Sequence, residues 1–144
     1  MTPADRASKR RAREAALQML YQWEIARSSV HEAIATYWPA HDPNGEVSED
    51  LRTFANGVVH GVVERLAELD ALIAARAVNW RVERMAVIDR MVLRLAIYEL
   101  LADADTPPKV VINEALELAR TYSGDESVAF VNGILDAVRR DLKR

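Results

Sequence analysis

Apolar residues recur at intervals of three and four positions along almost the whole chain. No segment alternates apolar and polar residues convincingly, as a half-buried strand would, and the β-branched residues fall inside the helical patterns. Half of the 144 residues are hydrophobic, which is enough to bury a core. This periodicity predicts an all-α protein of one domain with about seven helices.

Capping residues and prolines set the boundaries of the expected helices. Ser29 and Ser48 are suited to cap two of them, and Pro39 is expected to end the first of these two. Thr106 stands before two prolines as the cap of a later helix, and a loop is expected at residues 39–47. The predicted helices cover about residues 3–27, 30–38, 49–73 with a break near 66–70, 82–101, 108–121 and 125–142.

The residue types offer little for catalysis or metal binding. The absence of cysteine excludes disulfides, cysteine-ligated metals and thiol nucleophiles. The three histidines form no HExxH pair, and no phosphate-binding, dinucleotide-binding or calcium-loop motif is present. We therefore expect no catalytic residues, no metal and no cofactor. Without a long apolar run or a secretory signal, the chain is expected to be a cytoplasmic protein with no membrane partner.

The charge of the chain is distributed unevenly. The formal net charge is −3, but residues 1–14 carry a net charge of +3 and the remaining 130 residues carry −6. A basic segment on an acidic body indicates a polyanionic partner at one end of the molecule. A solvated helix start is the alternative interpretation, and the charge alone does not decide between the two.

The cationic side chains of the first helix fall mostly on one side. On a helical wheel of about 100° per residue, Arg11 points away from the others, and Tyr21 lies almost opposite the apolar stripe. The four that share one sector are Arg6, Lys9, Arg10 and Arg13. Cations with an exposed aromatic ring are typical of a surface for single-stranded nucleic acid or for a protein partner.

A second candidate surface lies where the last two helices meet. Tyr122 and Phe130 could stack on bases, although aromatic residues at helix ends often belong to the core. The carboxylate of Glu126 repels phosphate but can accept a hydrogen bond from a base amino group. Gly133 is expected to have a packing reason, because glycine inside a helix costs up to about 1 kcal/mol relative to alanine.

Four segments carry a distinctive pattern: residues 10–21 (RRAREAALQMLY), 89–100 (DRMVLRLAIYEL), 110–119 (VVINEALELA) and 130–136 (FVNGILD). Together they resemble the NusB family of transcription antitermination factors. The match is collinear from about residue 6 to residue 140, and the last three segments together are specific to the family.

The resemblance implies a fold of two packed helical lobes, at about residues 1–78 and 79–144, and a role without catalysis. It implies binding to the single-stranded boxA element of nascent ribosomal RNA together with NusE, a small-subunit ribosomal protein, and association with the elongating RNA polymerase. Tyr21 and Asp89 match positions that face NusE. The matched RNA-binding positions are Lys9, Arg10, Arg11, Arg13, Tyr122, Glu126 and Phe130, although some relatives have aspartate at position 126.

Two other classes of protein remain for comparison. The helical RNA-binding lobe of ribosomal RNA cytosine-C5 methyltransferases also resembles NusB, but those enzymes need a nucleotide-fold domain and catalytic cysteines, and this chain has no cysteine. A helical adaptor or homodimer without sequence-specific RNA binding stays open as the alternative. Self-association could then mask the RNA surface and regulate it.

Overall fold

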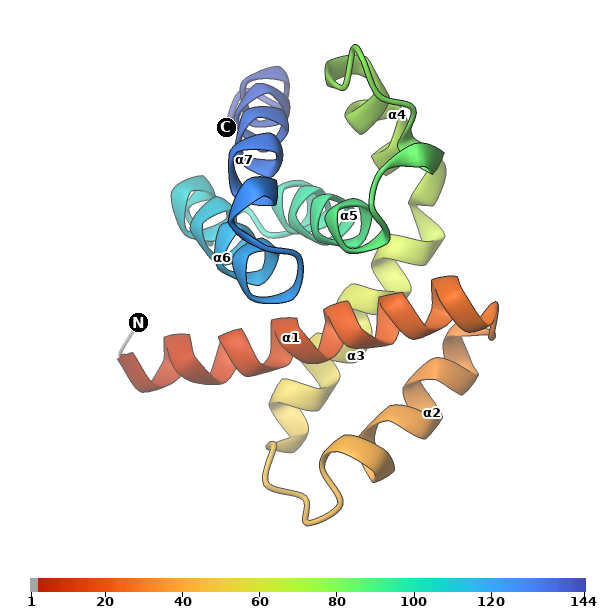
Figure 1. The fold of residues 1–144 in the computed structure, drawn as a ribbon. Coiled ribbons are helices and arrows are strands. Elements are labelled where there is room, and N and C mark those ends of the chain that lie inside the picture. Colours follow the sequence, from red (N-terminus) through yellow and green to blue (C-terminus); the bar gives the residue numbers. More distant parts are fainter. Residues whose placement is uncertain (1–2) are drawn as a thin grey trace. The chain divides into compact units, whose positions relative to one another are not determined.

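The computed structural model describes the backbone of residues 3–144 and the side chains of residues 9–144. Within this range the chain forms seven α-helices and one short 3-10 helix and has no strand, which confirms the all-α prediction (Figure 1). In chain order they are α1 (Pro3–Ala26), α2 (Val30–His41), α3 (Glu49–Glu64), α4 (Leu66–Arg76), η1 (Val82–Arg84), α5 (Val87–Ala102), α6 (Pro108–Tyr122) and α7 (Asp125–Asp141).

The helices group into two compact units, residues 1–63 and residues 64–144. This division by contacts falls earlier in the chain than the expected lobe boundary near residue 78, which stays a prediction. None of the helices that the structure describes combines the length and the hydropathy needed to cross a lipid bilayer.

A buried tyrosine joins α1 and α2 in the first unit. The hydroxyl of Tyr37 donates to Gln18 Oε1 at 2.6 Å and accepts from Arg11 Nη1 at 3.0 Å. Burial raises the pKa of Tyr37, and the hydrogen bond from Arg11 opposes that rise. The next residue of α2 contacts α3, because Trp38 Nε1 donates to Asn56 Oδ1 at 3.0 Å. Polar contacts from two consecutive residues of α2 therefore link it to both α1 and α3.

The loop after α2 is organised by one carboxylate. Asp42 accepts hydrogen bonds from the backbone N–H groups of Glu46 and Val47, each at 2.9 Å, and from Arg52 Nη2 at 2.6 Å. The Val47 N–H above all, with Arg52 and the Glu46 N–H, holds the pKa of Asp42 below its usual range, although burial of the carboxyl opposes this. The side chain of Asp42 thus closes the turn that carries Gly45, whose φ is +67°.

The serine caps are confirmed, and the predicted effect of Pro39 is wrong. Ser29 Oγ accepts from Glu32 N–H at 3.0 Å, and Ser48 Oγ accepts from Leu51 N–H at 3.3 Å. Pro39 lies inside α2, which continues to His41. Because Pro39 stands in the exposed last turn of the helix, its missing N–H removes a single hydrogen bond at a solvated end.

Helix α5 is the centre of the second unit. Its residues from Asp89 to Ile97 are all buried, and α4, α6 and α7 each pack against it (Figure 1). Arg94 pairs with Asp70 of α4 through two 2.8 Å contacts, and Arg76 of α4 pairs with Asp141 of α7. These ion pairs link α4 to α5 and to α7.

Three boundaries of the second unit differ from the sequence-based expectation. The long stretch after Ser48 breaks at Arg65, just before the predicted region. Residues 82–84 form a 3-10 turn, and α5 begins at Val87 because Met85 and Ala86 are extended. Thr106 does not cap α6; its hydroxyl donates to Asp103 at 2.5 Å, and Pro107 occupies the cap position.

The glycines of the last helices have different roles. Gly124, between α6 and α7, has a φ of +128° and donates to the carbonyl of Ala119 at 2.9 Å, so it ends α6. Gly133 is exposed, and a Cβ built on it meets no atom within 4 Å. The packing reason expected for Gly133 is therefore wrong.

Candidate nucleic-acid interface

The basic start of α1 presents its cations in three different environments. Arg10 is exposed, and Lys9 is half-buried with its Nζ 5.8 Å from the centre of the Phe54 ring. Arg13 is only 4% exposed, and its guanidinium lies 5.8 Å from the same ring. Arg11 lies against Tyr37 of α2, away from the others as predicted. The side chain of Arg6 lies outside the described residues.

These environments separate cations that can meet a phosphate from cations that support the helix. Arg10 is exposed and the half-buried Lys9 keeps part of its side chain accessible, so both can approach the backbone of a nucleic acid. Arg13 is buried beside Phe54, and Arg11 is fixed by its hydrogen bond to Tyr37. The structure therefore gives Arg13 and Arg11 supporting positions, one against Phe54 and the other against Tyr37.

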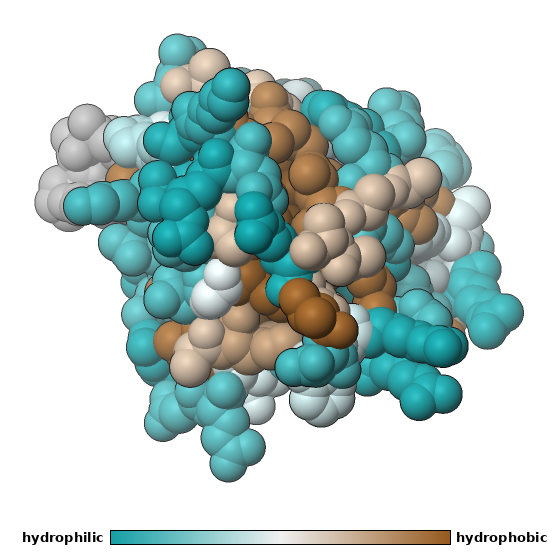
Figure 2. Space-filling view, turned by 90° about the horizontal axis from the view of Figure 1, so that it is seen from above, coloured by the Kyte–Doolittle hydropathy of each residue, from teal (hydrophilic) through white to brown (hydrophobic). Residues whose placement is uncertain are grey.

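Large apolar side chains are exposed in two places. On α1, Tyr21 is 41% exposed and Ile25 is 54% exposed; because they are four residues apart, they share one face of the helix. In the segment after α4, Val78 and Trp80 are 86% and 57% exposed. Figure 2 shows that apolar surface lies between hydrophilic side chains on the face of the molecule seen there. Sequence reasoning identified Tyr21 but missed Ile25. Its position four residues after Tyr21, on the same face of the helix, could have indicated it.

The junction of α6 and α7 brings together the second set of predicted residues. Tyr122 is the half-buried last residue of α6, and Glu126 lies exposed in the first turn of α7. Phe130 follows four residues later and therefore shares a face of α7 with Glu126. At the same junction, Ser127 Oγ donates to Asp89 Oδ2 of α5 at 3.1 Å. The predicted residues of the second unit are thus close neighbours.

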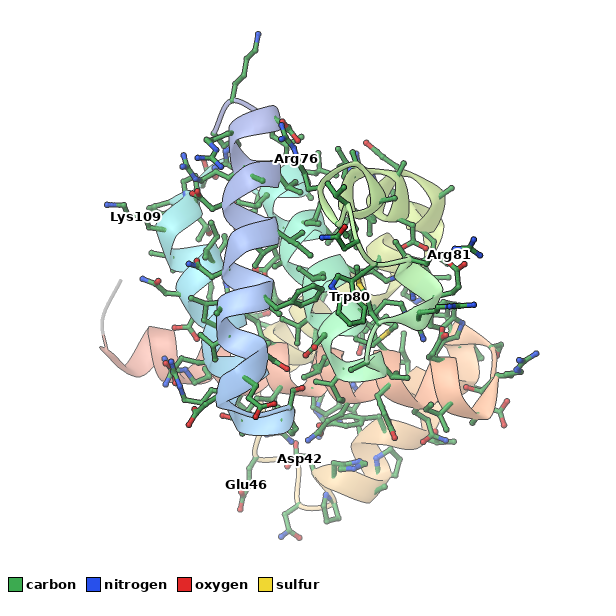
Figure 3. All side chains as sticks on the ribbon, turned by 45° about the horizontal axis from the view of Figure 1, so that its top comes forward. Asp42, Glu46, Arg76, Trp80, Arg81 and Lys109 are labelled. Atoms are coloured by element: carbon green, nitrogen blue, oxygen red, sulfur yellow. The ribbon has the colours of Figure 1, made fainter. Side chains whose placement is uncertain are left out.

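A pocket of about 290 Å³ opens beside Phe130 in the second unit. Trp80 meets Phe130 edge to face, with ring centres 6.3 Å apart and planes at 76°. Figure 3 shows Trp80 in the segment between α4 and α5, with Arg81 pointing away from it. The pocket is lined by Trp80, Arg84, Met85, Ala86, Asp89 and Phe130.

Asp89 is the acidic residue in the lining of this pocket. It is 8% exposed, and its second carboxylate oxygen, Oδ1, is buried and has no hydrogen-bond partner among the described residues. Sequence reasoning named Asp89 and Phe130 but missed Trp80 and Arg84. Trp80 could have been noticed from the sequence, because it is a large aromatic residue between polar neighbours in a segment without helical periodicity.

The structure gives no sign of a metal centre in its described part, where no group of three or more His, Asp or Glu side chains could hold an ion. The two surfaces contain cations, aromatic rings and carboxylates in positions suited to binding. Such an arrangement can attract phosphate, stack on bases and accept hydrogen bonds from base edges.

Comparisons with known proteins converge on one family. Residues 10–140 match the model of the NusB family. The transcription antitermination protein NusB of Solibacter usitatus is 48% identical over 136 residues, which cover 94% of this chain and 91% of that protein. The solved structure of NusB from T. maritima is 35% identical, with a TM-score of 0.82 and coverage of 92% and 91%.

A further solved structure has the same fold at lower sequence identity. It contains the antitermination factors NusB and NusE in complex with double-stranded RNA. The matching chain is 23% identical, has a TM-score of 0.83 and is covered over 98% of its length by 94% of this chain.

Proposed function

The chain belongs to the NusB family, and from this premise we propose that it is an RNA-binding transcription antitermination factor. In this proposal it acts in the cytoplasm with NusE, binds the boxA element of nascent ribosomal RNA and joins the elongating RNA polymerase. The role is one of binding and needs no catalytic group. The match to the family over residues 10–140 is the observation that carries the proposal.

The basic face of α1 supports RNA binding through its accessible cations. When Lys9 and Arg10 contact RNA phosphates, they displace cations that are condensed on the RNA. The resulting affinity depends on the salt concentration and not on the RNA sequence. Arg13 and Arg11 then support the helix, through their contacts with Phe54 and Tyr37. This assignment divides the four cations of the resemblance into two contacting residues and two supporting ones.

The junction of α6 and α7 supplies contacts to bases. Phe130 and Tyr122 are half-buried, so each keeps an accessible part of its ring while its position is fixed by packing. The exposed carboxylate of Glu126 can accept a hydrogen bond from a base amino group. We assign the sequence-dependent part of RNA binding to these three residues.

The exposed turn of α1 is our proposed contact with NusE. Tyr21 and Ile25 together offer an aromatic and an aliphatic side chain on one face, which is typical of the centre of a protein interface. Asp89, the other residue that the resemblance assigns to NusE, is 8% exposed and lines the pocket beside Phe130. Any partner of Asp89 therefore has to enter that pocket.

A binding titration tests the proposed function. The fluorescence anisotropy of a labelled boxA RNA from the host ribosomal leader is measured against protein concentration, with and without purified NusE. A scrambled RNA of the same composition is the matched control. We expect specific binding that NusE strengthens. Absence of RNA binding at low salt would contradict the proposal and favour the adaptor or homodimer instead, which the exposed Ile25 and Val78 would suit.

A further inference from the structure

The pocket beside Phe130 contains a carboxylate whose hydrogen bonding is incomplete. Asp89 Oδ2 accepts from Ser127, but Oδ1 is buried without a partner among the described residues. A buried acceptor of this kind costs free energy unless a ligand supplies a donor. Because Asp89 also lines the pocket, a ligand that enters the pocket contacts the side chain of this incompletely satisfied carboxylate.

The walls of the pocket restrict the shape and polarity of such a ligand. Trp80 and Phe130 present aromatic surface, and Met85 and Ala86 add apolar surface. A volume of about 290 Å³ lies near the lower end of the range for small-ligand sites. A small, planar and largely apolar group with one N–H donor fits these walls, and a nucleobase with an exocyclic amino group has these properties.

The two arginines beside the pocket favour a nucleotide over a cationic side chain, although the exposed carboxylates of Glu83 and Glu126 offset part of their charge. Arg84 lines the pocket and Arg81 lies exposed on the same segment. These guanidinium groups would repel an incoming lysine or arginine, whereas they attract the phosphates on either side of an inserted base. A neutral base also leaves the cation of Arg84 and the anion of Asp89 to balance each other.

We propose that this pocket binds one unpaired, amino-bearing base of the RNA, stacked against Trp80 and hydrogen-bonded to Asp89. The inference rests on the proposed RNA-binding function and extends it to Trp80 and Arg84, two residues outside the matched RNA-binding positions. Trp80 supplies stacking, Asp89 accepts from the amino group, and Arg84 meets a neighbouring phosphate. The base lies beside Phe130, so the pocket continues the surface formed by Tyr122, Glu126 and Phe130.

Cytosine and uracil form a matched pair of probes for this pocket. The two bases have nearly the same size, but cytosine carries an amino donor at the position where uracil carries a carbonyl oxygen. The carboxylate of Asp89 should therefore attract the first and repel the second. A charge-assisted hydrogen bond to a base is expected to change affinity by about tenfold.

The experiment measures binding of oligocytidylate and oligouridylate of about 12 nucleotides by the full-length protein. We expect the wild type to prefer oligocytidylate about tenfold. The Asp89→Asn variant should lose this preference, because an amide can rotate to donate or accept. The Trp80→Ala variant should bind both oligomers more weakly, by about fivefold to a hundredfold for one lost stacking contact. Val78→Ala is the matched control, since Val78 belongs to the same exposed segment but does not line the pocket.

Tryptophan fluorescence gives a second readout that does not depend on affinity. A base stacked on Trp80 should quench its emission, so the quenching by saturating oligocytidylate should be lost in Trp80→Phe. Circular dichroism melting curves confirm that each variant is folded. Equal affinity of the wild type for the two oligomers, or unchanged quenching in Trp80→Phe, overturns the inference.

The outcomes separate this inference from the proposed function. Binding of boxA RNA without any effect of the Trp80 and Asp89 variants keeps the proposed function and rejects the base pocket. Loss of NusE binding in Asp89→Asn, with the preference between the two oligomers unchanged, would assign the pocket to a cationic side chain of the protein partner. Absence of all RNA binding by the wild type rejects both.

Discussion

Removing two cations of α1, Lys9 and Arg10, should lower the salt dependence of RNA binding, whereas removing a third, Arg13, should not. Lys9 and Arg10 are accessible, whereas Arg13 is 4% exposed against the Phe54 ring. Each phosphate contact to a single strand contributes roughly 0.7 to the slope of log affinity against log salt. The double variant Lys9→Ala/Arg10→Ala should therefore lower the slope by about 1.4.

The Arg13→Ala variant should change the stability of the protein and not the salt dependence of RNA binding. Its loss removes a buried side chain and a cation–π contact, so the free energy of unfolding should fall by about 1–2 kcal/mol while the salt slope stays unchanged. The assay is anisotropy of labelled boxA RNA between about 50 and 200 mM salt, with urea unfolding measured in parallel. Lys109→Ala, an exposed cation on α6, is the control for a general loss of positive charge (Figure 3).

Two results would refute this reasoning. An unchanged slope in the double variant would show that the accessible cations do not contact phosphate. A lower slope in Arg13→Ala with unchanged stability would show that Arg13 leaves its buried position to bind RNA.

Three further predictions concern stability and partner binding. Gly133→Ala should stabilise the protein by up to about 1 kcal/mol, because the new Cβ meets no atom, and a rise in Tm checks this. Since the pKa of Asp42 is lowered in the folded state, its contribution is present above the usual aspartate range and is lost as the pH falls through the folded-state pKa; Asp42→Asn should therefore flatten the acid side of a urea-midpoint profile. Tyr21→Ala should weaken NusE binding at least tenfold and leave binding to RNA alone intact; normal co-purification with NusE would count against that contact.

Helix periodicity and short-range capping made most of the fold predictable. Ser29 and Ser48 act within one turn of their own position, and Gly124 acts through its own backbone angle, so each could be identified from its neighbours in the chain. Pro39 was misread because a helix tolerates a missing N–H in its last exposed turn. Thr106 was misread because its hydroxyl found a carboxylate three residues earlier.

The site was predictable only where the contacts follow helix spacing. A wheel separated Arg11 from Lys9 and Arg13, and the structure keeps that separation. It could not show that Arg13 is buried, because this depends on Phe54, which is 41 positions away in the chain.

The pocket was beyond sequence reasoning for the same reason. It joins Trp80, Asp89 and Phe130, which come from a connecting segment and two different helices. The spacing of residues along one helix does not show which residues of different elements lie together. The family resemblance had identified Asp89 and Phe130 as site residues, but not Trp80.

The most direct test of the account is a single-round transcription assay with the host polymerase. The template carries boxA upstream of a terminator, and the measured quantity is the fraction of transcripts that extend past the terminator with NusE present. We predict that adding the protein raises this fraction, that a scrambled boxA abolishes the rise, and that Lys9→Ala/Arg10→Ala reduces it. Read-through that is the same with and without the protein would contradict the account.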